Sequence, residues 1–298
     1  MTFYRGAEGT ELWFDEIGPA DAEPVIVLAG GPARHPVYMG DLAGFGENNR
    51  LVLPHLRGVG KSPAAQEPGR ATWVGQAEDI ALLDQALGGG PKLVLAHSAG
   101  ARVAIRYLQQ NPSRVKGLVL ITPAVDWLVR AVPDRLEIAA RRMKEEAFRD
   151  AWRVVTGPRT YRDEPTFNQW QRAIAPAGYA HWGETEQAHS KVGECRLEAA
   201  LAYLGAEAPG DLLDRIGQIE VPVLSIAGTE DALVGCSPVR ALSDVFARGE
   251  FVAIDDCGHY PWVEQPKAFA SVISGFTDSL LFWSPDEAPG DEQDQGLF

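Results

Sequence analysis

A serine stands between small residues at the point where a predicted strand meets a predicted helix. The run Lys-Leu-Val-Leu-Ala-His-Ser-Ala-Gly-Ala at 92–101 is typical of a buried strand, a sharp turn at Ser98 and the start of a helix. Such a turn strains the serine backbone and exposes its oxygen at the carboxyl edge of a sheet. The N–H of Ala99 would then point at the oxyanion that forms when this oxygen attacks a carbonyl. We therefore predict that Ser98 is a nucleophile, with a simple helix-capping serine as the alternative.

A serine nucleophile needs a base that accepts its proton and an acid that orients the base. In hydrolases built on a parallel sheet the three residues follow the order serine, acid, histidine, with the last two in loops after late strands. Of the six histidines, only His259 lies late enough in the chain, and Asp231 precedes it in a loop of the right kind. We predict Asp231 as the acid, although it could instead cap the next helix, and Glu230 and Asp255 lie nearby.

The glycines at 30 and 31 follow another predicted strand and precede Pro32. Glycine lets the backbone approach a reacting carbonyl closely, so we predict the N–H of Gly31 as the second oxyanion donor beside that of Ala99. A plain tight turn is the alternative interpretation. No glycine-rich spacing continues from this loop into a helix, so a phosphate site is not indicated. We expect neither a cofactor nor a metal.

The elements that must position these residues alternate between apolar strands and helices. We expect strands at 12–17, 25–29, 51–53, 92–96, 115–121, 221–226 and 251–254, and helices at 77–87, 101–110 and 266–282. This alternation indicates an α/β fold with a mostly parallel sheet and helices on both faces. From 126 to 210 the chain is rich in Trp and Arg and predicts only helices, at 136–152 and 185–204. We therefore predict a core formed by 1–125 and 211–283, a helical cap at 126–210, and a disordered acidic tail at 284–298.

The composition excludes several classes of function. The 298 residues are 45% hydrophobic and carry a net charge of −14, which argues against an electrostatic grip on nucleic acid or anionic lipid. No apolar stretch reaches the length of about 18 residues that a membrane span needs. The cysteines Cys195, Cys236 and Cys257 cannot all pair and lack metal-ligand spacing, so we expect a reducing, cytoplasmic compartment. We interpret Cys257, two residues before His259, as a small apolar filler.

With these motifs the chain resembles the α/β-hydrolase family, and within it the proline iminopeptidase branch. The segments Gly-Gly-Pro at 30–32, Arg-Gly-Val-Gly-Lys-Ser at 57–62, Asn-Pro-Ser-Arg-Val at 111–115 and Trp-Val-Glu-Gln-Pro at 262–266 are similar to that branch's motifs. The chain departs from the branch at several positions, which are Ala29, Ala33, His55, Ala96, His97 and Ala99. The resemblance implies a serine hydrolase fold with an inserted cap, while the departures weaken the expectation of proline specificity.

The predicted cap carries a further part of the resemblance. The run Trp-Gly-Glu-Thr-Glu-Gln-Ala-His at 182–189 is similar to the branch's W-x-x-W-E-x-A-H stretch, and Arg-Leu-Glu at 196–198 is similar to its R-I-E segment. In that branch the two glutamates hold the free amine of the substrate. The resemblance therefore implies Glu186 and Glu198 as amine ligands, with Trp182 as a further substrate-binding residue. A solvated helix face is the alternative interpretation of these glutamates.

Three classes of function follow from this sequence. The first is acyl transfer to water from a small peptide or amide with a free amine, as the resemblance implies. The second is an esterase or lactonase for an apolar acid, whose pocket would be lined by tryptophans at 127, 152, 170 and 182. The third is a binding module without catalysis, which has no need of a serine, an acid and a histidine in this order.

Overall fold

The computed structural model describes residues 2–281, and eight strands of this part of the chain form one sheet. The strands are β1 (Thr2–Arg5), β2 (Glu11–Ile17), β3 (Pro24–Leu28), β4 (Arg50–Pro54), β5 (Lys92–His97), β6 (Val115–Ile121), β7 (Val223–Gly228) and β8 (Gly249–Ile254), in the spatial order β1-β2-β4-β3-β5-β6-β7-β8. The pairs β1–β2 and β2–β4 are antiparallel, and all pairs from β4 to β8 are parallel. The predicted mostly parallel sheet is therefore confirmed, with β1 as an additional edge strand.

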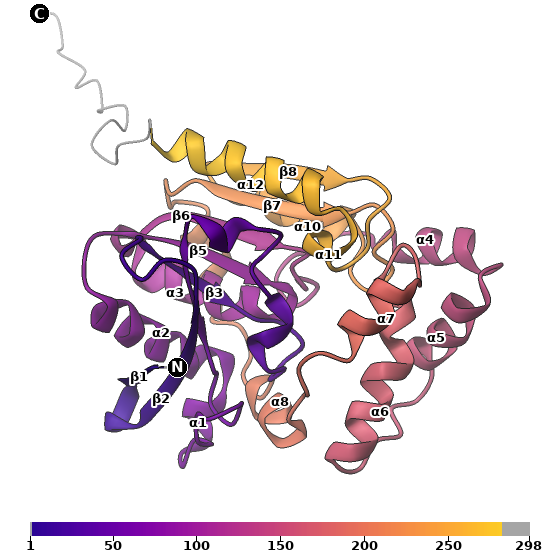
Figure 1. The fold of residues 1–298 in the computed structure, drawn as a ribbon, viewed down its shortest axis with the longest axis horizontal. Helices are drawn as coiled ribbons and strands as arrows, with labels where there is room; N and C mark the ends of the chain where they lie inside the picture. The colour runs from indigo at the N-terminus through magenta and orange to yellow at the C-terminus, as the bar shows by residue number, and fades with distance from the viewer. Residues whose placement is uncertain (1, 282–298) are drawn as a thin grey trace, which may run out of the picture.

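Each central strand contributes to two apolar layers, because successive side chains of a strand point to opposite faces. In β5, Val94 packs into one buried cluster, together with α2 (Trp73–Leu87) and α3 (Ala101–Gln110). Its neighbour Leu95 packs into the other cluster, together with α12 (Pro266–Leu280). Figure 1 shows α12 on one side of the sheet and α2 and α3 on the other. Helices thus cover both faces, as the continuous apolar strand runs predicted.

Shorter helices complete this part of the fold. They are α1 (Pro68–Ala71), α9 (Leu212–Ile216), α10 (Ser237–Ser243) and α11 (Pro261–Glu264). Helix α9 packs on α3, so the chain has returned to the sheet before β7 begins. The tail predicted at 284–298 lies outside the described residues.

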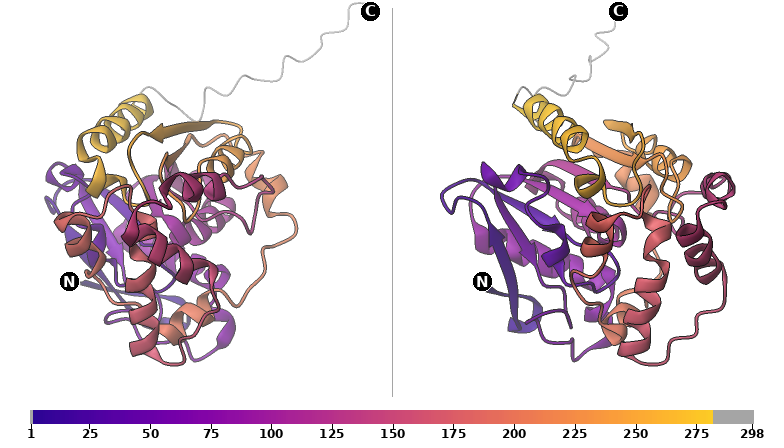
Figure 2. Two further views of the ribbon diagram at one scale, coloured as in Figure 1. Left: turned by 90° about the vertical axis from the view of Figure 1, so that its right-hand side faces the viewer. Right: turned by 45° about the vertical axis from the view of Figure 1, so that its right-hand side comes forward.

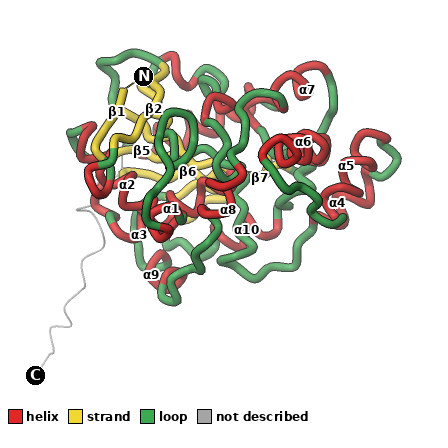
Figure 3. Tube along the Cα trace, turned by 90° about the horizontal axis from the view of Figure 1, so that it is seen from below, coloured by secondary structure: helices red, strands yellow, loops and turns green. Residues whose placement is uncertain are grey.

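A group of helices lies between β6 and β7, in the range where the sequence predicted a cap. They are α4 (Arg135–Arg142), α5 (Glu146–Thr156), α6 (Glu164–Ile174), α7 (Glu184–Ser190) and α8 (Leu197–Tyr203). Figure 3 and the right-hand view of Figure 2 show α4, α5 and α6 to one side of the strands. Within the described residues, no helix is long and apolar enough to cross a bilayer.

Each of the two long helices predicted in this insertion is in fact a pair of shorter helices. In the first pair, α4 ends at Arg142 and α5 follows it. The buried side chain of Arg142 donates a hydrogen bond of 2.6 Å to the carbonyl of Tyr179. The second is interrupted at 191–196, where Gly193 has a φ of +75°. There the backbone pairs with the loop after β3: His35 donates its N–H to Glu194, and Arg196 donates its N–H to Ala33. Backbone groups that pair in this way are not available for the hydrogen bonds of a continuous helix.

Candidate active site

Ser98 lies at a strained turn between β5 and α3, as predicted. Its φ is +50°, a left-handed value that costs a non-glycine residue about 1–3 kcal/mol. Two glycines make room for the turn. A Cβ on Gly100 would lie 2.6 Å from the carbonyl oxygens of Leu28 and Ala29, and a Cβ on Gly30 would lie 2.8 Å from the Cβ of Ser98. The loop after β3 is therefore packed directly against the serine.

His259 and Asp231 form a buried pair. The Nδ1 atom of His259 lies 2.7 Å from Oδ2 of Asp231, and both side chains are at least nine-tenths buried. The other carboxylate oxygen, Oδ1, accepts the N–H groups of Leu233 and Val234, at 2.9 and 3.2 Å. The sequence left two alternatives for Asp231, to orient the histidine or to cap the following turn. Its side chain makes both kinds of contact.

The two acidic neighbours of Asp231 in the sequence analysis face elsewhere. Glu230 pairs with Arg141 over 3.1 Å, and Asp255 is exposed. The loop after β7 lies next to the loop after β8 that carries His259, and Asp231 is the carboxylate of the β7 loop that contacts the histidine.

Glu264 holds the loop around His259, a role that the sequence analysis missed. Its carboxylate accepts the N–H groups of Gly258 and Tyr260, on either side of the histidine, and that of Ala180, at 3.0, 3.1 and 2.6 Å. Burial raises the pKa of Glu264 to about 7, while the three N–H donors oppose this rise. The segment 262–266 carried part of the family resemblance, yet only the fold shows what its glutamate contacts.

His97 ties three loops of the site together. The N–H of Gly30 donates to the hydroxyl of Tyr38 over 2.6 Å, so the hydroxyl proton can be donated to Nδ1 of His97, 2.8 Å away. The Nε2 atom of His97 therefore carries the proton and donates it to the carbonyl of His259 over 3.0 Å. Burial holds the pKa of His97 well below its usual range, so this imidazole is neutral.

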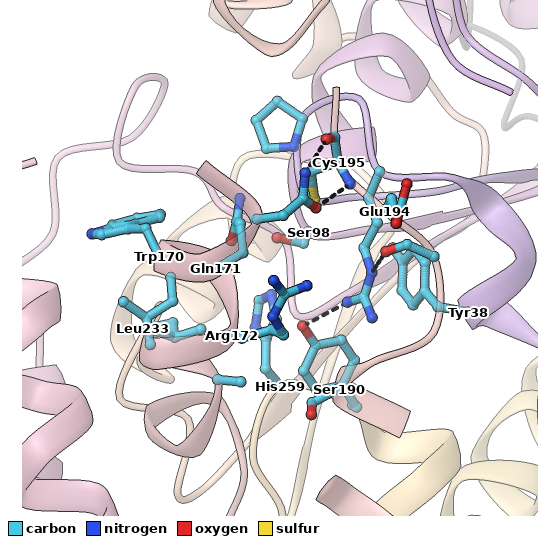
Figure 4. A pocket seen from close by; sticks show the side chains of 18 of the residues that line it. Tyr38, Ser98, Trp170, Gln171, Arg172, Ser190, Glu194, Cys195, Leu233 and His259 are labelled. Carbon is cyan, nitrogen blue, oxygen red and sulfur yellow. Dashed lines mark hydrogen bonds between the residues drawn. The ribbon is translucent and has the colours of Figure 1, made fainter. Parts of the chain in front are cut away.

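A cavity of about 350 Å³ opens onto Ser98 and His259. Figure 4 shows Gln171 and Arg172 of α6 on one side, Tyr38 and Glu194 on the other, and Ser98 and His259 between them. Gly31 lines this cavity with a φ of +50°, so the predicted oxyanion loop is at the site. Ala99 follows Ser98 directly and is buried. Of the four tryptophans that the esterase alternative would place at a pocket, Trp170 is the one among the lining residues of this cavity.

The structure does not bring the predicted substrate-binding residues of the cap to this cavity. Glu186 accepts the N–H of Gly183 at the start of α7, Glu198 is exposed on α8, and Trp182 packs on Tyr179. None of the three predicted residues lines the cavity. The interruption at 191–196 is the reason: α7 packs against α11, whereas α8 packs against α1 and α6. Neither glutamate faces this cavity, so their binding of one substrate amine stays a prediction of the sequence resemblance.

One group of metal-ligating side chains occurs among the described residues, formed by Asp15, His35 and His55. A histidine that binds a metal usually donates its other ring N–H to an acceptor. Here Nδ1 of His35 accepts the N–H of Val37, and Nδ1 of His55 accepts the N–H of Lys61. Both Nε2 atoms therefore carry protons, and that of His55 lies 3.0 Å from Asp15. These contacts fit a hydrogen-bonded cluster, and they do not fit a metal centre.

Comparison with known proteins agrees with this geometry. The model of the alpha/beta hydrolase family matches residues 13–272. A proline iminopeptidase from Neisseria meningitidis is 27% identical over 285 residues, covering 86% of this chain and 89% of that protein. A putative 2-succinyl-6-hydroxy-2,4-cyclohexadiene-1-carboxylate synthase from Bacillus subtilis is 24% identical over 280 residues, covering 92% and 97%.

Solved structures show the same fold. A putative aryl esterase from Burkholderia cenocepacia superposes with a TM-score of 0.72 at 19% identity, covering 95% of this chain and 99% of that one. An esterase from Rhodococcus sp. ECU1013 superposes with a TM-score of 0.72 at 22% identity, covering 94% and 98%. The resemblance that the motifs indicated is therefore confirmed, and the chain belongs to the alpha/beta hydrolase family.

Proposed function

We propose that this protein is a serine hydrolase that cleaves an ester or amide bond through an acyl-enzyme. One observation carries the proposal: His259, joined to the buried Asp231 over 2.7 Å, lines the same cavity as a serine held at positive φ. Chain order, loop positions and this contact all agree with a nucleophile, a base and an orienting acid.

The acylation step follows from the hydrogen bonds. Asp231 accepts the Nδ1 proton of His259, so the Nε2 lone pair is available to take the proton of Ser98. As this proton moves to Nε2, the serine oxygen forms a bond to the carbonyl carbon of the substrate. The carbonyl oxygen becomes an oxyanion, which the N–H groups of Gly31 and Ala99 hold. When the carbon–leaving-group bond breaks, His259 returns the proton to the leaving group.

Deacylation repeats the same steps with water. His259 takes a proton from a water molecule while the water oxygen adds to the acyl carbonyl carbon. His259 then gives this proton to the oxygen of Ser98 as the ester bond of the acyl-enzyme breaks. The acid leaves and the free serine is restored. This cycle uses only groups of the chain, the substrate and water.

The choice between a peptidase and an esterase turns on the cap. The relative from Neisseria meningitidis is a proline iminopeptidase, but the two carboxylates that the resemblance assigned to the substrate amine lie outside the cavity here. Solved structures of the same fold include esterases. We therefore propose hydrolysis of small esters or amides without a requirement for a free amine.

A fluorophosphonate probe tests the catalytic assignment. Folded wild-type protein should be labelled, Ser98→Ala should not, and the same substitution should abolish turnover of chromogenic short-chain esters. Labelling that persists in Ser98→Ala would place the nucleophile elsewhere. Absence of labelling in folded wild-type protein would favour a binding module.

A further inference from the structure

The cavity beside Ser98 is cationic, although the whole chain has a net charge of −14. Four basic side chains line it, from Arg34, Arg159, Arg172 and Lys191, and the one acidic lining residue is Glu194. Within the described part of the chain, none of these four cations forms an ion pair. With 41 acidic and 27 basic residues in the sequence, carboxylates are abundant, yet this cavity gathers unpaired positive charge.

Arg34 supplies a fixed charge beside the oxyanion loop. Its guanidinium donates to the carbonyls of Val192 and His189, at 2.6 and 3.3 Å, and to the hydroxyl of Tyr260 at 3.2 Å. It also lies 4.0 Å from the ring centroid of Tyr38. These partners hold the side chain in place without neutralising it, because carbonyls and phenols carry no net charge. A permanent positive charge is therefore held within the wall of the cavity.

The other three cations are exposed and free to turn toward a ligand. Arg172 lies near the end of α6, Arg159 lies in the loop before α6, and Lys191 follows α7. They come from separate segments that meet at one cavity. A guanidinium binds a carboxylate through two parallel N–H···O bonds, whereas it repels an ammonium group. The charge of this site is thus opposite to what an amine-bearing substrate needs.

We propose that the cavity takes an acyl substrate that carries a carboxylate away from the bond to be cleaved. This proposal rests on the proposed serine hydrolase function. The reacting carbonyl lies at Ser98, the acyl chain contacts apolar lining residues such as Ile174 and Leu233, and the carboxylate pairs with Arg172 and its cationic neighbours. A cavity of about 350 Å³ suits a small substrate such as the half-ester of a dicarboxylic acid.

A matched pair of chromogenic esters tests the proposal. The anionic ester is 4-nitrophenyl hydrogen adipate, and its neutral counterpart is the methyl 4-nitrophenyl diester of the same acid. Arg172→Gln, Arg159→Gln and Lys191→Gln should each lower kcat/KM for the anionic ester by about 2- to 5-fold, the usual weight of one exposed charge pair. The neutral ester should change less than about 2-fold, and added salt should slow only the anionic one.

Arg162→Gln is the matched control, because Arg162 is an exposed arginine in the same loop that does not line the cavity. It should alter neither ester. Equal losses for both esters in the three cavity variants, or none for either, would overturn the proposal. Because Arg172, Arg159 and Lys191 are exposed, thermal unfolding should show that these variants fold normally.

Binding of adipate to Ser98→Ala, measured by calorimetry, separates this proposal from the catalytic one. Adipate binding that is weakened by an added Arg172→Gln substitution supports the anion site even if the wild-type protein takes no fluorophosphonate label. Labelled wild-type protein whose Ser98→Ala form binds no adipate keeps the hydrolase assignment and removes the anion site.

Discussion

The Nε2 atom of His97 donates a hydrogen bond to the backbone carbonyl of His259, over 3.0 Å. The residue before the nucleophile thereby holds the backbone of the proposed base. Thr122 donates to the same carbonyl over 2.9 Å, and Tyr38 links the other side of the imidazole to Gly30. One buried histidine therefore sets the relative position of the nucleophile turn, the base loop and the oxyanion loop.

Replacing His97 with Phe should lower kcat more than it raises KM, because it loosens the proposed base and the oxyanion loop together. We expect a loss of about 1–3 kcal/mol in the free energy of unfolding from the polar groups left unpaired. Thr122→Val is the control, since it removes only the second donor to the carbonyl of His259. Equal kcat values in the two variants would show that the link to Gly30 has no catalytic importance.

Asp231→Asn should separate the two roles of this side chain. The amide oxygen can still accept the N–H groups of Leu233 and Val234, so the melting temperature should stay close to that of the wild-type protein. The amide N–H₂ cannot accept the Nδ1 proton of His259, and kcat should fall by roughly 10³- to 10⁴-fold. Asp231→Ala should lose both activity and stability. A modest fall in kcat for Asp231→Asn would remove Asp231 from the catalytic group.

Neutralising the cap glutamates should have no selective effect. Because Glu186 and Glu198 lie outside the cavity, Glu186→Gln and Glu198→Gln should leave kcat/KM for aminoacyl amides and for neutral esters within about 2-fold of the wild-type values. Steady-state kinetics on both substrate classes checks this. A rise in KM confined to amine-bearing substrates would instead restore the amine site that the sequence resemblance implied.

Protonation of His189 should weaken the fold in mild acid. Burial lowers the pKa of His189 to about 4, and its ring lies between the hydroxyl of Tyr179 and the carbonyl of Tyr38. A depressed histidine pKa means that the unfolded chain takes up the proton first. The stability linked to His189 is therefore complete above about pH 6.5 and lost as the pH falls toward 4.

Urea unfolding of wild-type protein and His189→Gln at pH 7 and pH 5 measures this effect. The wild-type protein should lose about 2 kcal/mol more than the variant over this interval. The raised pKa of Glu264 acts in the opposite direction, since its contribution is lost as the pH rises through about 7, but it is common to both proteins. Parallel losses in the two proteins would show that His189 titrates normally.

Local sequence patterns were sufficient to predict the sheet and to propose the catalytic group. Strands such as 115–121 are continuous apolar runs because both of their faces are buried, and the structure has β6 at the same residues. The small residues beside Ser98 reflect the steric limits of a single sharp turn. Asp231 and His259 each lie in one loop that follows a predicted strand. Such features are visible in a single sequence because steric fit and loop position act locally.

The cap could not be interpreted in the same way. A helix was predicted through 185–204 from composition, but the backbone at 191–196 pairs with residues 33–35, which lie more than a hundred positions away in the chain. That pairing moves Glu186 and Glu198 apart. No local sequence pattern predicts this pairing, because the competing hydrogen bonds come from a remote segment.

From the sequence alone came the fold class, the strained serine turn, and the serine, aspartate and histidine in their order. The tertiary structure decided which groups surround them: the contact of His97 with the backbone of His259, the carboxylate of Glu264 around the same loop, and the unpaired cations at the cavity. Arg34 illustrates the reason, since it contacts Val192, 158 positions along the chain. A side chain's charge is written in the sequence, but its partners depend on which distant segments the fold brings within hydrogen-bonding distance.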